Sequence, residues 1–247
     1  MADLLLQARA LTVRFGGLTA VDAVDATLHA GELVGIIGPN GAGKTTFFNA
    51  ISGVIAPTSG QLVAQGDDLT GQAPHRYAAH GIARTFQTPR VFADMAVADN
   101  VAFGMRFAGR HRPAPAGLAS VDDILAMLGL ERLATQAAGS ITPSQQRLLE
   151  IGMALGTRPR ILLLDEVAAG LTEAEVDAMA RRIRRLRDDW GLTVVWIEHA
   201  VTTLLRYVER VLVLHQGRKI ADGTPAEVVR DPAVVEAYLG DEMAALP

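Results

Sequence analysis

The chain has 247 residues, of which 49% are hydrophobic, and its formal net charge is −4 at pH 7. This length suits one large α/β domain, with or without a subdomain, and the apolar fraction is enough for a full-size core. The acidic balance makes nucleic acid an unexpected partner, and the absence of cysteine excludes disulfides and thiolate metal sites and fits a reducing compartment.

The first half of the chain alternates predicted strands and helices. Residues 4–15 and 23–29 alternate weakly between apolar and polar side chains and are predicted strands. Phe15 ends the first strand, and Gly16 and Gly17 form the turn after it. The other predicted elements in this half are a buried strand at Leu33–Ile37, a helix from Lys44 to about Gly53, strands at Gln61–Ala64 and Ile82–Phe86, and helices at Ala96–Phe107 and Val121–Leu128 on either side of a loop at Ala108–Gly117.

The second half continues the alternation. Its predicted elements are a helix at Ser144–Leu155 with Leu148, Ile151 and Leu155 on one face, a strand at Ile161–Leu164, an amphipathic helix at Glu173–Trp190 with Val176, Met179, Ile183, Leu186 and Trp190 as its buried stripe, strands at Thr193–Ile197 and Val211–Leu214, and two short helices that begin with a capping box at Thr224–Glu227 and with Asp231-Pro232. The unbroken apolar strands and the alternation predict a parallel α/β core with right-handed crossovers.

Apolar runs such as Ile161–Leu164 and Thr193–Ile197 are far shorter than the roughly 20 residues that a membrane-spanning helix needs. The start, Met1-Ala2-Asp3-Leu4, lacks a basic region followed by an apolar stretch, so no signal peptide is expected. We therefore predict a soluble, cytoplasmic protein that reaches a membrane only by docking on another protein.

A glycine-rich segment lies between the predicted strand Leu33–Ile37 and the next helix. Its residues are Gly38, Pro39, Asn40, Gly41, Ala42, Gly43, Lys44, Thr45 and Thr46. They match G-x-x-x-x-G-K-[ST] in the strand–loop–helix context that gives this pattern its meaning. Glycines let the loop curl with its N–H groups inward, and the helix start favours bound polyphosphate. We predict that Lys44 reaches the β- and γ-phosphates of a nucleoside triphosphate and that the Thr45 hydroxyl ligates Mg²⁺.

The predicted strand Ile161–Leu164 runs into two carboxylates, Asp165 and Glu166. Next to a phosphate loop, Asp165 would hold Mg²⁺ through water, and Glu166 would polarise the attacking water. On its own, the pair is as well explained by an ordinary acidic loop after a strand. The phosphate loop favours the catalytic interpretation, because its metal needs an acidic partner.

Three further residues are ambiguous on the sequence alone. Gln87 follows the predicted strand Ile82–Phe86 and is either a sensor of Mg²⁺ or of the attacking water, or plain polar surface. His199 follows the strand Thr193–Ile197 at a place where α/β ligand sites form, although a solitary histidine is more often structural. Phe15 is suited both to stacking on an adenine and to a core. A row of arginines is interpreted as the solvated face of its helix rather than as a lipid or RNA patch: Arg181, Arg182, Arg184, Arg185 and Arg187.

In this order, the glycine-rich segment, Gln87, the helix start with Gln145-Gln146-Arg147, the Asp165-Glu166 pair and His199 resemble an ABC-transporter ATP-binding subunit. The resemblance covers about Leu6 to Gly240. Within that family, four segments are similar to the G-type subunit of bacterial branched-chain amino acid importers: Arg14-Phe15-Gly16-Gly17-Leu18, Ile82-Ala83-Arg84-Thr85-Phe86-Gln87, Ala168-Ala169-Gly170-Leu171, and Gly223-Thr224-Pro225 through Ala237-Tyr238-Leu239-Gly240.

The resemblance implies an α/β P-loop NTPase fold with a parallel sheet, an N-terminal antiparallel β-subdomain and a helical subdomain. In this single ABC ATPase domain, residues from about 1–91 and 157–247 would form the core with its β-subdomain. Residues from about 92–156 would form the helical subdomain, which carries the signature helix and, from about Phe92 to Ala138, takes a permease coupling helix. Phe15 would stack on adenine, Gln87 would be the Q-loop residue that meets Mg²⁺, and His199 would be the switch histidine near the γ-phosphate.

The resemblance also implies partners. Two ATPase subunits would clamp two ATP head to tail on two membrane permease subunits at the cytoplasmic face of the inner membrane. An extracytoplasmic binding protein would deliver the cargo. Each phosphate chain would meet the other subunit's signature helix, so Thr142, Ser144 and Gln145 would contact the ATP of the partner.

The signature departs from the family's usual Leu-Ser-Gly-Gly-Gln and has Ile141-Thr142-Pro143-Ser144-Gln145 instead. As a helix start it is sound, because Thr142 can cap, Pro143 fits the first helical position and Gln145 completes a capping box. As a phosphate site it is weakened, because Pro143 has no N–H and Ser144 adds a side chain where glycine allows close approach. A lost charge-assisted hydrogen bond costs about 1.5–3 kcal/mol. We therefore expect a heterodimer with one strong and one weak site, with a homodimer as the alternative.

Two other functions remain open. One is a nucleotide-binding partner subunit that barely hydrolyses ATP, which the altered signature favours and the intact Lys44, Asp165 and Glu166 oppose. The other is a soluble ABC ATPase acting on DNA or ribosomes; such proteins usually have two ATPase units or a long coiled coil, and this chain shows neither. A GTPase is disfavoured because no Asn-Lys-x-Asp guanine-reading motif occurs. The leading prediction is an ATPase that energises import of branched-chain or related amino acids.

Overall fold

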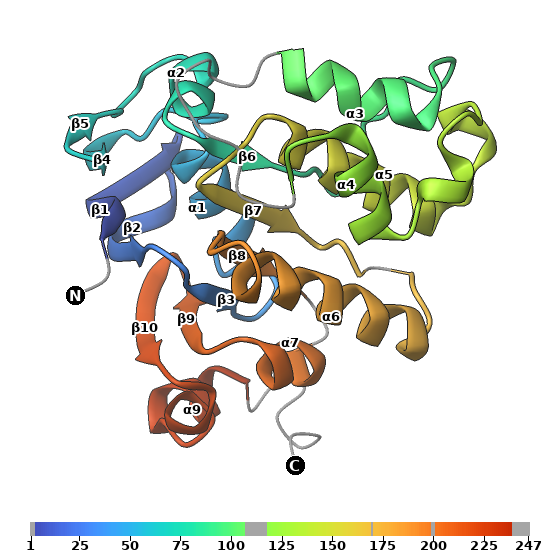
Figure 1. The fold of residues 1–247 in the computed structure, drawn as a ribbon. Helices are drawn as coiled ribbons and strands as arrows, with labels where there is room; N and C mark the ends of the chain where they lie inside the picture. Colours follow the sequence, from blue (N-terminus) through green and yellow to red (C-terminus); the bar gives the residue numbers. More distant parts are fainter. Residues whose placement is uncertain (1–2, 107–117, 169, 199–200, 239–247) are drawn as a thin grey trace.

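The computed structural model describes residues 3–106, 118–168, 170–198 and 201–238. Two sheets organise them, and helices cover both faces of the larger sheet (Figure 1). The predicted loop at Ala108–Gly117 and His199 lie outside the described residues.

The smaller sheet is antiparallel and has the strand order β2-β1-β4-β5. Its strands are β1 (Leu4–Phe15), β2 (Leu18–His29), β4 (Ser59–Ala64) and β5 (Asp67–Asp68). The strand predicted at 23–29 in fact begins five residues earlier, at Leu18. The two-residue turn at Gly16 and Gly17 explains the difference, because it lets Leu18 pair directly with Phe15.

The larger sheet has the strand order β10-β9-β3-β8-β7-β6, and all its neighbours are parallel except β10 and β9. Its strands are β3 (Leu33–Ile37), β6 (Ile82–Arg84), β7 (Ile161–Asp165), β8 (Thr193–Ile197), β9 (Arg210–His215) and β10 (Arg218–Gly223). Every residue of β3, β7 and β8 is buried. This confirms the predicted parallel core, since strands buried on both faces need layers on both sides.

The helices are α1 (Lys44–Ile51), α2 (Pro74–Ala79), α3 (Val97–Arg106), α4 (Val121–Leu128), α5 (Pro143–Gly156), α6 (Glu173–Asp188), α7 (Val201–Tyr207), α8 (Pro225–Val228) and α9 (Pro232–Tyr238), with short 3₁₀ turns at Glu131–Leu133 and Ala138–Ser140. Helices α2 and α7 and strands β5 and β10 were not predicted from the sequence. Helix α6 ends at Asp188, two residues before the predicted end at Trp190. Trp190 is half-buried and still packs against the core that holds the predicted stripe. Gly191, which follows it with a positive φ, ends the helical register there.

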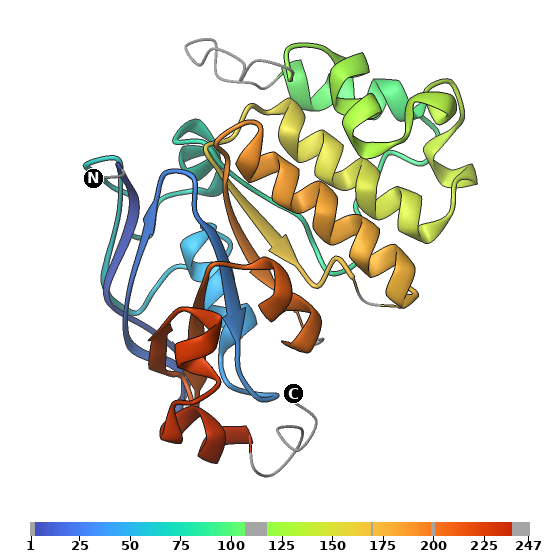
Figure 2. The same ribbon diagram turned by 60° about the horizontal axis from the view of Figure 1, so that its bottom comes forward.

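The larger sheet separates two hydrophobic cores. Phe48 of α1 packs with residues of the smaller sheet and with Leu163 of β7 on one face. The neighbouring Leu162 and Leu164 face the other core, which contains side chains of α3, α4, α5 and α6. Helices α3, α4 and α5 pack on one another and lie on the opposite side of the molecule from β1 and β2 (Figures 1 and 2).

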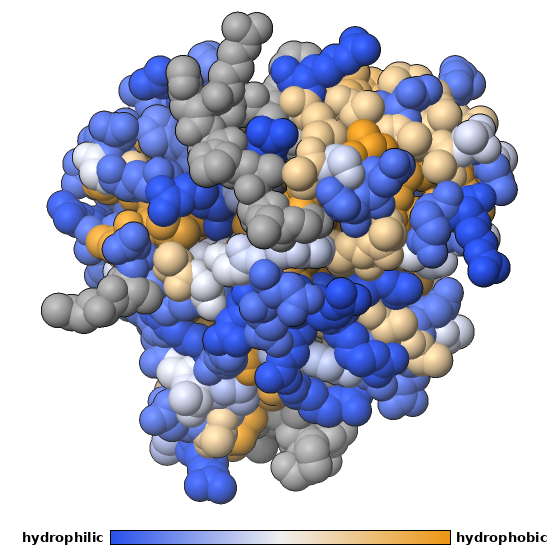
Figure 3. Space-filling view, viewed as in Figure 1, coloured by the Kyte–Doolittle hydropathy of each residue, from blue (hydrophilic) through white to orange (hydrophobic). Residues whose placement is uncertain are grey.

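The surface of α6 confirms the predicted solvated face for three of the five arginines, whereas Arg182 and Arg187 are half-buried and Arg187 donates to the carbonyl of Gly31. Arg181, Arg184 and Arg185 are exposed, and the last two pair with Asp188 and Asp189 one turn later. Figure 3 shows this region as hydrophilic, whereas the surface over α3 and α4 is largely hydrophobic. Among the residues that the structure describes, no helix combines the length and the apolar character that crossing a membrane requires.

Candidate functional site

The glycine-rich loop joins the end of β3 to the start of α1, as predicted. Two of its glycines are structurally required. Gly38 has a φ of 153°, and a Cβ there would overlap the carbonyl oxygen of Leu214 at the end of β9. Gly43 has a φ of 97°, and its Cβ would overlap the carbonyl oxygen of Ala20. The loop therefore curls tightly against two other strands, which only glycine at these positions allows.

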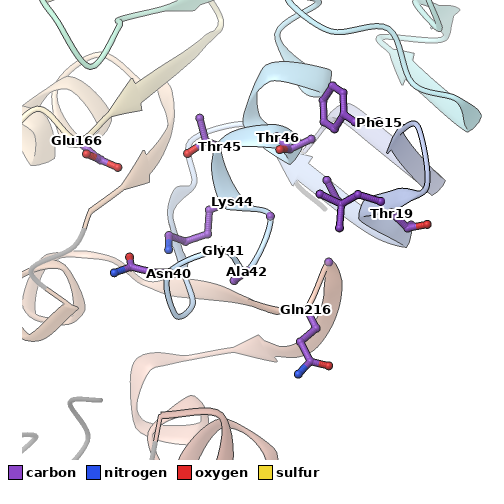
Figure 4. Close-up of a pocket in the computed structure, with 14 residues that line it drawn as sticks. Phe15, Thr19, Asn40, Gly41, Ala42, Lys44, Thr45, Thr46, Glu166 and Gln216 are labelled. Atoms are coloured by element: carbon purple, nitrogen blue, oxygen red, sulfur yellow. The ribbon is translucent and has the colours of Figure 1, made fainter. Parts of the chain in front are cut away.

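A cavity of about 640 Å³ lies over this loop, a size within the range of small-molecule sites. It is lined by Phe15, Leu18, Thr19, Ala20, Asn40, Gly41, Ala42, Gly43, Lys44, Thr45, Thr46, Glu166, Gln216 and Gly217. Phe15 is 49% exposed and lies on the opposite side of the loop from Glu166 (Figure 4). An exposed aromatic ring at the edge of the cavity fits the stacking role better than the core role.

The turn between β9 and β10 forms one side of the cavity, which was not predicted from the sequence. Gly217 donates its N–H to the carbonyl of Ala42 at 3.0 Å and accepts one from Asp22 at 2.8 Å. This turn braces the loop from a segment more than 170 residues further along the chain. The Gln216-Gly217 turn is a recognisable signal, but its partner was not predictable without the unrecognised strand β10.

Lys44 is buried at the start of α1, with 6% of its surface exposed. Its Nζ donates to the carbonyl oxygens of Gly38 at 2.6 Å and Pro39 at 3.0 Å. Burial lowers the pKa of Lys44, and the carboxylate of Glu166 opposes that change. The loop thus holds a cation inside the curl of its own backbone, where an anion would meet it together with the N–H groups.

The two predicted carboxylates lie at the end of β7, next to β8 and β6 in the sheet. Asp165 is buried, and its Oδ2 accepts a hydrogen bond from Arg84 Nη2 at 3.2 Å. The Asp165 backbone N–H donates to the Thr85 hydroxyl at 3.2 Å. The carboxylate is therefore held from strand β6, on a side where the sequence analysis assigned no role.

Arg84 connects three parts of the site. Its Nη1 donates to Asn49 Oδ1 at 2.7 Å and to Ser52 Oγ at 2.9 Å, both at the end of α1. Its guanidinium also lies over the rings of Phe48 and Phe86. Burial lowers the pKa of Arg84, and Asp165 opposes that change. A charged residue in a short, half-buried strand was the available signal, and it was not used.

Glu166 is also buried, and its backbone has a φ of 50°. A left-handed conformation is uncommon for a residue with a side chain and persists where the surrounding structure enforces it. The backbone N–H of Glu166 donates to Ile197 O at 3.0 Å. Gln87 Nε2 donates to Glu166 Oε2 at 2.6 Å. The tertiary structure thus brings together two predicted site residues that are far apart in the chain.

The segment that carries Gln87 is fixed by Glu150 of α5, another residue without a predicted role. Glu150 is 5% exposed, and its two oxygens accept the backbone N–H groups of Phe86 at 3.3 Å and Arg90 at 3.0 Å. Burial raises the pKa of Glu150 to about 7, against these N–H groups and the charges of Arg90 and Arg84. Because the Phe86 N–H bonds to Glu150, β6 ends at Arg84 rather than at Phe86 as predicted.

The altered signature forms the predicted helix start. Thr142 caps α5, Pro143 is its first residue, and Gln145 completes the capping box. The hydroxyls of Thr142 and Ser144 lie 3.0 Å apart. A second cavity of about 610 Å³ is lined by Thr142, Pro143, Ser144, Gln145, Arg147, Gly170, Leu171 and Glu175. It shares no residue with the cavity over the glycine-rich loop, so Thr142, Ser144 and Gln145 do not join Lys44 within one chain.

The strand before His199 has a buried acid of its own. Glu198 Oε1 accepts the backbone N–H of Ala168 at 2.7 Å and the Trp196 Nε1–H at 3.1 Å. It therefore ties the residues after Glu166 to the end of β8.

A family model described as ABC transporter matches residues 21–169, which include the glycine-rich loop, Gln87, the start of α5 and both carboxylates. This chain belongs to the ABC transporter family. A second model, described as branched-chain amino acid ATP-binding cassette transporter, matches residues 218–244.

The ABC family assignment extends over the whole length of known relatives. The chain is 37% identical to the high-affinity branched-chain amino acid transport ATP-binding protein BraF of Pseudomonas aeruginosa, over 98% of this chain and 100% of the relative. It is 36% identical to the protein of the same description, LivG, of Escherichia coli K12, with the same coverage. The crystal structure of the ADP conformation of MJ1267, an ATP-binding cassette of an ABC transporter, matches with a TM-score of 0.84 and 31% identity, over 97% of this chain and 100% of that one. The chain is thus an ABC ATPase, which confirms the predicted fold and the predicted ATP binding.

Proposed function

We propose that this ABC ATPase energises an importer for branched-chain or related amino acids. The observation that carries the proposal is the full-length similarity to BraF and LivG, whose names state this transport. The match of residues 218–244 to a model of the same description supports it independently of the catalytic motifs. In this proposal the chain works on two permease subunits at the cytoplasmic face of the inner membrane, and an extracytoplasmic binding protein delivers the cargo.

The residues around the glycine-rich loop would have different roles in ATP binding and hydrolysis. Lys44 and the loop N–H groups would hold the β- and γ-phosphates, and Phe15 would stack on the adenine. Glu166 would polarise the attacking water, and His199 would lie near the γ-phosphate.

The oxygens of Thr45, Asp165 and Gln87 suit Mg²⁺, which prefers hard oxygen ligands and takes few from the protein. Among the described residues no group of three or more His, Cys, Asp or Glu side chains is placed to hold a metal. Phosphate oxygens and water would therefore complete the coordination, and the ion would neutralise charge on the phosphates.

Residues from about 92–156 would form the subdomain that docks on the permease, with residues 1–91 and 157–247 as the core. Phe92 is 41% exposed and packs edge-on against Phe103 of α3, with ring centroids 4.7 Å apart. Phe103 is half-buried, so Phe92 is the exposed member of this aromatic pair, and an exposed aromatic ring suits a contact with a partner helix.

We also propose an asymmetric dimer with a second ABC ATPase subunit. Glu175 lies in the cavity at the start of α5, and its carboxylate accepts hydrogen bonds from Thr172 and Ser144. A negative charge at that position opposes the γ-phosphate that a signature helix would receive from the partner, and Pro143 has no N–H to attract one. The site that uses Lys44 and Glu166 of this chain would be the strong one.

Uptake of labelled leucine by proteoliposomes that contain the permeases and both ATPases tests the proposed function. We expect ATP-dependent uptake that Lys44→Ala reduces at least tenfold, because the lysine holds the phosphates. Uptake of an unrelated solute with no leucine transport would reject the cargo. Failure to co-purify with permeases would favour the soluble ATPase. If Lys44→Ala leaves the ATPase rate of the assembled complex unchanged, the chain is better explained as the weakly hydrolysing partner subunit.

A further inference from the structure

The segment 86–90 joins strand β6 to the region of α3 and carries Gln87, whose amide contacts Glu166 at 2.6 Å. The segment lies outside the strands and helices that the structure describes. Its two ends are held by one side chain, because Glu150 accepts the N–H of Phe86 with one oxygen and the N–H of Arg90 with the other. Gln87 lies between these two anchor points. The position of its amide therefore depends on a residue of α5.

The chain that follows is anchored by a second buried polar side chain. Asn100 of α3 is fully buried; its Oδ1 accepts the Phe92 N–H at 2.8 Å, and its Nδ2 donates to the carbonyls of Phe92 at 3.1 Å and Ala96 at 3.0 Å. Helices α3 and α5 pack on each other. Side chains of α3 and α5 thus hold the backbone between Phe86 and Ala96 by hydrogen bonds. Of these side chains, Glu150 bonds nearest to Gln87.

We propose that Glu150 is a positioning residue for ATP hydrolysis, which holds the segment 86–90 so that the Gln87 amide meets Glu166. Helix α5 begins at Pro143, and Glu150 lies two helical turns further along it. A shift of α5 at its N-terminal end is therefore transmitted by a rigid element to Gln87 and on to the carboxylate of Glu166. The inference depends on ATP hydrolysis by this chain and is independent of the proposed cargo.

A carboxylate is chemically suited to this position. Two N–H groups converge on it, and an ionised carboxylate offers two acceptor oxygens and no donor. A glutamine offers one acceptor oxygen, while its NH₂ group would face the second N–H. Burying the charge also opposes folding, as the raised pKa of Glu150 records. A residue that served only to stabilise α5 would be better replaced by an apolar one, so the position is explained by what it holds.

The steady-state ATPase rate of the full chain in its assembled complex tests the proposal. We expect Glu150→Ala and Glu150→Gln to lower kcat roughly tenfold to a hundredfold, the effect of losing one charge-assisted hydrogen bond. KM for ATP should stay within about threefold, because Lys44 and the other residues that line the nucleotide cavity are unchanged. The midpoint of thermal unfolding of Glu150→Gln should not fall. The matched control is Thr157→Val, which removes a hydrogen bond to Ala154 at the other end of α5 and should leave kcat unchanged.

A double-mutant cycle separates positioning from general loosening of the helix. If Glu150 acts through Gln87, then Glu150→Ala should change kcat less than about threefold once Gln87→Ala is present. Losses that multiply in the double variant would overturn the proposal, as would a wild-type kcat in Glu150→Gln. If Glu150→Ala does not fold, the cycle is run with Glu150→Gln. Loss of leucine transport with this cycle intact would reject the cargo and leave the inference standing.

Discussion

Individual residues at the nucleotide site sit in conformations that local preference disfavours. Glu166 has a left-handed backbone, and Lys44 is buried with its charge directed at backbone carbonyls. Each cost is met by neighbours: Ile197 accepts the Glu166 N–H, and the loop encloses the ammonium. Such strain persists only where the surrounding structure over-determines it. The left-handed backbone of Glu166 and the buried charge of Lys44 are therefore both maintained by the surrounding fold.

Gly38→Ala tests whether close approach, rather than backbone freedom alone, requires glycine in the loop. The added Cβ would overlap the Leu214 carbonyl, so we expect a loss on the order of 3 kcal/mol in the free energy of unfolding. For a chain of this size that lowers the unfolding midpoint by roughly 10 °C. Gly41→Ala is the control, because Gly41 has a φ of 76° with open space around it and should lose only about 1 kcal/mol. Equal losses in the nucleotide-free proteins would contradict this account.

Helix α5 is the element that connects the separate parts of the molecule. Its first turn carries the altered signature, its middle carries Glu150, and its apolar side packs into the core with Leu149 and Ile151. Glu150 lies between Leu149 and Ile151 in the sequence and places an acidic side chain among the buried residues of the helix. Burying the charged form of Glu150 lowers the folding stability, and the size of this loss depends on pH.

Glu150 should make folding stability fall as the pH rises through neutrality. Its pKa is 4.5 in the absence of burial and about 7 in the fold, so between these values the folded state binds a proton that the unfolded chain releases. The stabilising contribution is complete below pH 4.5 and is lost as the pH rises through 7. Arg84 and Arg90 face this carboxylate and limit the loss. We expect the urea-unfolding free energy of wild type to fall from pH 5 to pH 8 by on the order of 2–3 kcal/mol more than that of Glu150→Gln. Parallel profiles would show that the group is not buried as described.

At the scale of the whole molecule, the cavity over the glycine-rich loop and the cavity at the start of α5 share no residue. The cavity over the glycine-rich loop has Lys44, Thr45 and the other residues proposed to bind the phosphates, and the cavity at the start of α5 has Thr142, Ser144 and Glu175. In the proposed dimer each would be completed by the partner subunit. The first cavity has Lys44 and Glu166, whereas the second has Glu175 and Pro143 at the place proposed to receive the γ-phosphate of the partner's ATP.

The asymmetry predicts unequal effects of the same substitution in the two subunits. In single-turnover hydrolysis by mixed dimers, Glu166→Gln should remove most of the turnover, because it disables the strong site. The equivalent change in the partner should cost less than about threefold, because that ATP faces the weakened signature of this chain. Equal losses on the two sides would reject the asymmetric dimer, and a stable homodimer with full activity would reject the heterodimer.

Structural features that depend on residues close together in the chain could be predicted from the sequence. Patterns within one element were sufficient for β3, α1, α4, β7 and β8, and for the capping boxes at Thr142 and Thr224. These features depend on period, turn chemistry and caps, which act over a few residues. Strand β10 and helices α2 and α7 lacked such a pattern, so they were missed.

By itself the sequence determined the parallel core, the phosphate loop and the acids at the end of β7, because each is written in consecutive residues. Only the tertiary structure decided what holds them in place. Arg84 meets Asp165, Gln87 meets Glu166, and Glu150 meets the N–H groups beside Gln87 across separations of about sixty to eighty residues. Such contacts follow from which strands pair and which helix covers them, and local propensity contains no information about either.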